Sequence, residues 1–360
     1  MTMTALIATR KGLFRATKRN ATWLLEAAGF SGVPVSMVLA SAQHDTCYAA
    51  LDHGHFGAKL HRSDDAGASW KEVAAPAYPA TENADEGVSL EMIWSLEFAE
   101  PGNALKLWAG TIPGGLFFSD DGGESWALNQ TLWTYCQQQK WFGGGFPSAG
   151  IHSICVHPDN TEHLLLGVSC AGVWQTTDGG ASWQTRSQGL RNEYMPAGQE
   201  YEAIGQDPHR LVQCHNNPDQ MWIQHHNGIF RSVDGANNWQ EITQVKPSVF
   251  GFAVVVHPAD GKTAWFVPGV KDECRIPVDA RLVVNRTRDG GKTFEALTAG
   301  LPQQSSYDLV YRHGLDIDST GDCLVMGSTT GNLWLSEDQG DSWQCLSNYL
   351  PPVYAVRCVG

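Results

Sequence analysis

The chain has 360 residues, a formal net charge of −14, 38 glycines and 14 tryptophans. Its acidity argues against nucleic acid or an anionic membrane as partner, and its longest apolar runs, such as 250–256, are too short to span a bilayer. The nine cysteines are an odd number without a Cys-x-x-Cys pair, and the first residues lack the pattern of a secretory signal. These features predict a cytoplasmic protein with free thiols.

The first predicted elements are three short strands at 5–9, 12–16 and 23–27. An eight-residue motif then recurs along the chain, Ser/Thr-x-Asp-x-Gly-x-Ser/Thr-Trp, and each copy follows an apolar strand. The motif predicts a hairpin in which Asp accepts backbone N–H bonds and Gly supplies a positive φ. The six copies lie at 63–70, 119–126, 176–183, 232–239, 287–294 and 336–343, with Ala236, Asn238 and Phe294 as departures from the pattern.

The spacing of the motif sets the expected architecture. A seventh unit is indicated at the N-terminus, where Gly12-Leu-Phe precedes Trp23 by the distance that separates Gly115 from Trp126. The closing aromatic residues stand at 23, 70, 126, 183, 239, 294 and 343, so the steps are 47 to 57 residues. That period is typical of four-stranded units that bury both faces by stacking on their neighbours. We therefore predict an all-β, seven-bladed β-propeller, with residues 1–360 as one domain.

Ring closure is predicted at the two ends of the chain. The N-terminal unit lacks an innermost strand, and the apolar segment 353–358 follows a complete seventh blade. We expect this C-terminal strand to complete blade one, because an open sheet edge would otherwise remain.

The motif resembles the Asp-box, or BNR repeat, of sialidases, xyloglucanases, sortilin-type receptors and photosystem II assembly factors. Over nearly its whole length the chain is most similar to soluble bacterial WD40, YVTN or BNR-like repeat proteins labelled glycosyl hydrolase or exo-α-sialidase. This resemblance implies the propeller fold, structural aspartates and a hydrolase acting on a small molecule or sugar in the central channel. Arg275-Ile-Pro277 is similar to a sialidase arginine motif, but it follows several copies of the repeat instead of preceding the first. A true sialidase is therefore not expected.

A divalent metal site is a second hypothesis for the channel. We expect the inner strands to end at proline turns, and counting back six residues gives a ring that includes His152 and Glu202, with His313 at the equivalent position of blade seven. Two imidazoles and a carboxylate can hold such an ion with open positions for water, and His225 or His226 is a further candidate ligand. The alternative is a polar channel whose residues hydrogen-bond one another. The proline turns are Pro101, Pro158, Pro208 and Pro258.

Charged residues near the expected channel mouth are candidates for catalysis. The loop 271–281 carries Asp272 and Arg275, which could act as a base or bind an anion, although a salt-bridged loop is the alternative. Glu91 and Glu202 complete the carboxylates that a glycosidase-like mechanism would need.

Ligand binding is predicted from aromatic residues. The segment 129–150 is expected to be a long loop without secondary structure, in which Trp133 and Trp141 could stack on a sugar or pack against the neighbouring blade. Tyr354 and Arg312 complete the candidate ligand-binding set. A non-catalytic binding or assembly module remains a third hypothesis.

Overall fold

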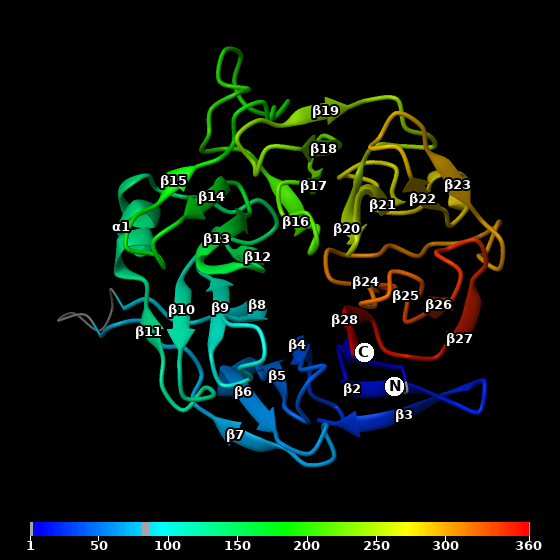
Figure 1. The fold of residues 1–360 in the computed structure, drawn as a ribbon, viewed down its shortest axis with the longest axis horizontal. Coiled ribbons are helices and arrows are strands. Elements are labelled where there is room, and N and C mark those ends of the chain that lie inside the picture. The colour runs from blue at the N-terminus through cyan, green and yellow to red at the C-terminus, as the bar shows by residue number, and fades with distance from the viewer. Residues whose placement is uncertain (1–2, 81–86, 360) are drawn as a thin grey trace.

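The computed structural model describes residues 3–80 and 87–359. Seven four-stranded antiparallel sheets form a ring around a central axis (Figure 1). The innermost strands contact one another in order around this ring, from β28 through β4, β8, β12, β16, β20 and β24. The predicted seven-bladed β-propeller is confirmed.

The strands of each blade are given from the inside outwards. Blade one contains β28 (Val353–Val359), β1 (Thr4–Thr9), β2 (Gly12–Arg19) and β3 (Thr22–Gly29); blade two contains β4 (Val35–Ala40), β5 (Cys47–Asp52), β6 (Ala58–Ser63) and β7 (Lys71–Val73). Blade three contains β8 (Met92–Phe98), β9 (Leu107–Ile112), β10 (Leu116–Ser119) and β11 (Ala127–Leu128); blade four contains β12 (Ile151–His157), β13 (Asn160–Val168), β14 (Gly172–Thr176) and β15 (Gln184–Thr185). Blade five contains β16 (Pro208–Gln213), β17 (Met221–His225), β18 (Ile229–Ser232) and β19 (Gln240–Ile242); blade six contains β20 (Gly251–His257), β21 (Asp260–Pro268), β22 (Val284–Thr287) and β23 (Glu295–Leu297). Blade seven contains β24 (Leu315–Ile317), β25 (Leu324–Gly327), β26 (Leu333–Ser336) and β27 (Gln344–Ser347).

The ring closes as the sequence predicts. Strand β28 pairs antiparallel with β1, so that the two ends of the chain share blade one (Figure 1). The side chains of Val353, Ala355 and Val356 are buried. The C-terminal strand therefore supplies both the missing ladder and part of the core of blade one.

The six motif copies form nearly identical hairpins, which we call the repeat hairpins. In the copy at 119–126, Ser119 Oγ donates to Asp121 Oδ1 at 2.8 Å, and the backbone N–H and hydroxyl of Ser125 donate to the two carboxylate oxygens at 2.9 and 2.6 Å. Gly123 lies at φ +87°, where glycine is tolerated without strain. The closing Trp126 donates to the backbone oxygen of Ala74 in the preceding blade at 2.8 Å. Each hairpin is thus stabilised internally, and this copy is also anchored to the neighbouring blade.

Two local expectations were wrong. The segment 129–150 is not all loop, because it contains helix α1 (Gln130–Gln138), which Asn129 caps by accepting from the N–H of Leu132. Pro208 is the first residue of β16 and not the turn after an inner strand. Proline is tolerated at the start of a strand, where its missing N–H costs no ladder bond.

Among the described residues, no helix is long and apolar enough to cross a bilayer.

Candidate active site

Irregularities in the innermost strands direct different side chains towards one end of the channel. Near the start of most of these strands the ladder to the second strand skips a residue, which forms a β-bulge. Bulges re-aim side chains and are frequent beside active sites. The skipped residues are Ser36, Trp94, His152, His209 and Tyr354 in five blades, and Phe252 with Ala253 in blade six.

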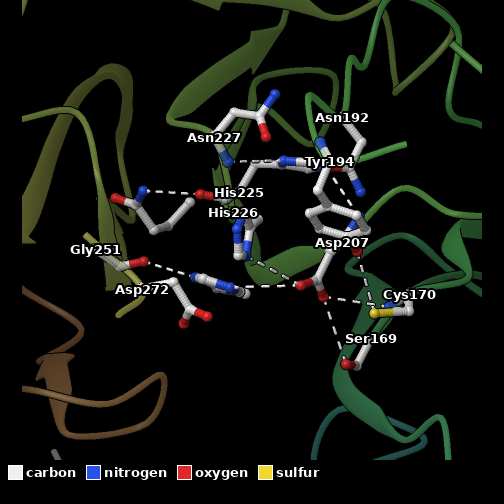
Figure 2. A network of polar contacts seen from close by, with 12 residues as sticks. Ser169, Cys170, Asn192, Tyr194, Asp207, His225, His226, Asn227, Gly251 and Asp272 are labelled. Carbon is white, nitrogen blue, oxygen red and sulfur yellow. Dashed lines mark hydrogen bonds and ion pairs between the residues drawn. The ribbon is translucent and has the colours of Figure 1, made fainter. Parts of the chain in front are cut away.

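A buried carboxylate lies between two imidazoles at this end of the channel. Asp207 stands directly before β16, His209 is the bulge residue of β16, and His226 follows β17. Asp207 Oδ2 is 3.7 Å from His209 Nε2 and 3.5 Å from His226 Nδ1. Figure 2 shows Asp207 and His226 facing each other. We call these three residues the Asp–His cluster.

Neighbouring groups fix the carboxylate of Asp207. Its Oδ1 accepts from the backbone N–H of Cys170 at 3.2 Å and from Ser169 Oγ at 3.4 Å, both in the turn between β13 and β14 (Figure 2). The backbone N–H of Asp207 donates to His225 Nε2 at 3.0 Å, while its carbonyl accepts from the N–H of His226. These contacts leave Oδ2 directed towards the two imidazoles.

The electrostatics of the cluster favour an ionised Asp207. Burial opposes its ionisation, but the contacts with His209 and His226 and the charge of Arg312 outweigh burial and hold its pKa well below the usual range. The pKa of His226 is raised, because its contact with the Asp207 carboxylate outweighs burial. Burial lowers the pKa of His225 to about 3, so this imidazole stays neutral.

Arg312 provides an unpaired positive charge beside the cluster. Its guanidinium carbon lies 4.8 Å from the ring centre of Trp94 and 5.4 Å from that of Phe252, on opposite sides of the ring of blades. Within the described part of the chain, Arg312 has no hydrogen bond or ion pair, and its Nε is buried without a partner. A covered guanidinium of this kind is suited to receive an anionic group from a ligand.

Arg275 lies over the same aromatic surface but has its own partner. Its guanidinium carbon is 5.4 Å from the ring centre of Phe252, and its Nη2 donates to Asp272 Oδ1 at 2.6 Å. Its Nη1 lies 3.5 Å from the hydroxyl of Tyr311. The predicted residues Asp272 and Arg275 therefore form an ion pair with each other at the edge of the site.

The predicted metal ligands are not brought together as a set. His152 and His313 are buried in the channel, where His313 Nε2 donates to the backbone oxygen of His152 at 2.7 Å. Burial and the nearby cations Arg312 and Arg210 hold the pKa of His152 well below its usual value. Glu202 is exposed in the loop before β16, because the register inferred from Pro208 does not apply in blade five. His225 contacts the Asp–His cluster through the backbone of Asp207.

The other predicted residues lie in varied surroundings. Glu91 is exposed just before β8. Trp133 and Trp141 are buried, with ring centres 4.8 Å from Tyr78 and 5.1 Å from Trp174 respectively, so they pack between blades. Tyr354 is the half-buried bulge residue of β28. The residues that sequence reasoning missed are Asp207 and His209; the signal for them is Asp-Pro-His at the start of an inner strand.

Comparison with known proteins supports the fold. No family model and no curated protein matches the chain. The structure of an ancestral GH74 enzyme matches with a TM-score of 0.59 and 19% identity over 87% of this chain, which spans only 38% of that protein's chain. The periplasmic gluconolactonase PpgL of Pseudomonas aeruginosa matches with a TM-score of 0.62 and 12% identity over 100% of this chain and 99% of its own. The structure of YCF48 bound to D1 peptide matches with a TM-score of 0.57 and 13% identity over 93% of this chain and 89% of its own. At these identities the likeness shows a seven-bladed β-propeller and nothing finer.

Proposed function

We propose that this chain is a hydrolase of the propeller type, which acts on a small anionic molecule or sugar derivative at the end of the channel where the inner strands begin. The observation that carries the proposal is the buried Asp–His cluster beside the unpaired guanidinium of Arg312. Seven-bladed neighbours that include a GH74 enzyme and a gluconolactonase are consistent with it.

The chemistry follows from the protonation states of the cluster. His209 Nδ1 lies 2.7 Å from the backbone oxygen of Gly251, and because a carbonyl only accepts, Nδ1 carries the proton and Nε2 presents a lone pair. That lone pair can take a proton from water as the water oxygen attacks the substrate, and the proton then passes to the leaving group as its bond breaks. Asp207 stabilises the imidazolium that forms. Arg312 would hold an anionic group of the substrate near this water.

The two-carboxylate mechanism of glycosidases fits this geometry less well. Such enzymes place an acid and a second carboxylate on either side of the scissile bond. Here the buried carboxylate of Asp207 faces imidazoles, and Asp272 is paired with Arg275. Hydrolysis by a water activated at an imidazole is therefore the reaction we favour.

A panel of chromogenic substrates tests the proposal. Aryl esters, lactones and aryl glycosides, each with and without a carboxylate, are assayed with the native chain, Asp207→Asn, Arg312→Met and the exposed control Asp159→Asn. We expect hydrolysis of a carboxylate-bearing substrate that falls at least about 100-fold in Asp207→Asn, because the His209 base then loses the carboxylate that stabilises its imidazolium. Arg312→Met should raise KM more than it lowers kcat.

Two outcomes would contradict the proposal. Loss of activity in Glu202→Gln together with full activity in Asp207→Asn would return the chemistry to the carboxylates predicted from the sequence. No hydrolysis of any substrate, with ligand binding that still depends on Arg312, would favour a non-catalytic binding propeller.

A further inference from the structure

The spacing of the Asp–His cluster is too wide for hydrogen bonds and suited to an ion. The contacts of Asp207 Oδ2 with His209 Nε2 and His226 Nδ1 measure 3.7 and 3.5 Å, whereas an N–H···O bond spans about 2.7–3.2 Å. All three ligand atoms lie within 4.8 Å of one another. Two ligands of a tetrahedral zinc ion, each about 2.0–2.1 Å from the metal, lie about 3.3–3.4 Å apart. Small movements of the side chains would complete such a shell.

The orientation of His209 provides an independent observation. A metal-bound histidine characteristically donates its other ring N–H to a backbone carbonyl or carboxylate, which fixes the tautomer and the ring. His209 makes this bond to the oxygen of Gly251 in the neighbouring blade, so its free lone pair is directed at Asp207. The ring is further held by stacking on Phe252, with ring centres 4.3 Å apart.

The remaining ligands are held in comparable ways. Ser169 and the N–H of Cys170 occupy the other oxygen of Asp207, which leaves Oδ2 free (Figure 2). His226 packs edge-to-face against Tyr194, with ring centres 4.9 Å apart, and is half-buried. The cluster is thus closed on the side of the blades and open on the side of His226.

We propose that Asp207, His209 and His226 bind one divalent metal ion of the zinc class, with its remaining position open to water or substrate. Two imidazoles and one carboxylate with an open position form a ligand set found in catalytic zinc sites. This inference rests on the same cluster as the proposed function and changes its chemistry: the ion would lower the pKa of a bound water, and the lone pair of His209 Nε2 would hold the metal instead of taking the proton. Arg312, beside the cluster, would then face an anionic ligand of the metal.

Metal content tests the inference directly. Protein purified without a histidine tag or chelator is analysed by elemental mass spectrometry, and protein stripped with a chelator is titrated with Zn²⁺ and with Co²⁺. We expect one equivalent of metal, and visible absorption of bound Co²⁺ typical of a four-coordinate site. His226→Gln and Asp207→Asn should weaken Zn²⁺ binding at least about 100-fold, because each removes a direct ligand. Zn²⁺ should raise Tm of the native chain but not of these variants.

A matched control is available in blade four, where β12 ends and β13 begins. His163 stacks on His157 with ring centres 5.2 Å apart and bonds to Gln175, so His163→Gln removes an imidazole pair that could bind metal adventitiously. This variant should bind Zn²⁺ like the native chain. Because His226 is half-buried, His226→Gln should remain folded, which circular dichroism checks.

Two results would overturn the metal site. Equal Zn²⁺ affinity in the native chain and in His226→Gln would place any bound ion elsewhere. Absence of tight binding by the stripped native chain would leave His226 as a protonated partner of Asp207. Hydrolysis that persists in the metal-free chain would show that the reaction needs no ion, so the metal site and the proposed function can fail separately.

Discussion

The repeat hairpins and the end of the channel use similar polar residues in opposite ways. In each hairpin the aspartate, hydroxyl and backbone groups satisfy one another, and the same bonds recur in all six copies. At the channel end every blade supplies a different residue, and buried atoms such as His152 Nε2 and Arg312 Nε lack partners. The repeated residues therefore stabilise the ring, whereas the unrepeated residues at the channel end offer unpaired groups to a ligand.

The largest expected effect on the stability of the ring comes from removal of the closing strand. Deleting residues 353–360 exposes the edge of β1 and removes the buried side chains of Val353 and Val356, each worth about 2 kcal/mol. A loss of about 4 kcal/mol or more is a large part of the stability of an ordinary domain. We expect a largely unfolded or aggregating protein by circular dichroism and thermal unfolding. Tyr349→Ala, at a side chain 94% exposed, is the control that should change neither; unchanged Tm in the deletion would contradict the closure.

A smaller effect is expected from a substitution in one repeat hairpin, which should lower stability and leave the channel end unaffected. Asp121→Ala removes three hydrogen bonds, so the free energy of unfolding should fall by about 2 kcal/mol while metal binding and hydrolysis stay unchanged. Asp120→Ala, at the exposed neighbouring residue, should leave the free energy of unfolding, metal binding and hydrolysis unchanged. Loss of activity without loss of stability in Asp121→Ala would give the repeat hairpins a functional role.

The effect of Asp121→Ala should depend on pH in a defined window. Hydrogen bonds from Ser125 and Ser119 lower the pKa of Asp121 to about 2 in the folded state. A depressed folded pKa contributes stability that is present above the unfolded pKa of about 4 and is lost as pH falls towards 2. The stability difference between native chain and variant should therefore be constant above about pH 5 and shrink towards pH 2, as urea unfolding can measure. A difference that is still undiminished at pH 2 would contradict it.

The fold could be predicted because its signals are local and repeated. The turn residues of each hairpin and the aromatic residue that closes it recur at a blade's length, so the count of blades and the closing strand followed directly. Even blade one, where Lys18 and Asn20 replace the usual residues, retained the spacing to Trp23. The cytoplasmic location and the absence of nucleic-acid and membrane partners stay predictions.

The site could be predicted only in part because it depends on register. The sequence predicts that Pro208 follows its inner strand, but Pro208 begins that strand. Counting back six residues from it therefore selects the exposed Glu202 and misses Asp207 and His209. The bulge that turns His209 towards the channel arises from pairing between strands, so the Asp-Pro-His sequence alone does not reveal it. Arg312 was predicted as a ligand-binding residue from the sequence, but its position over Trp94 and its lack of a partner needed the structure.

The smallest expected effect distinguishes strain from packing inside the repeat hairpins. Ala66 and Ala236 both adopt left-handed backbone, at φ +55° and +67°, but Ala66 is exposed whereas Ala236 is buried. Left-handed backbone costs alanine about 1 kcal/mol or more, and the freedom that glycine loses on folding offsets about half of any gain. Ala66→Gly should therefore raise the free energy of unfolding by about 0.5 kcal/mol, whereas Ala236→Gly should gain nothing, because it also loses a buried methyl group worth about 0.8 kcal/mol. Equal gains in urea unfolding would show that the buried methyl contributes nothing to the packing of blade five, and a loss in Ala66→Gly would show that the left-handed turn carries no strain.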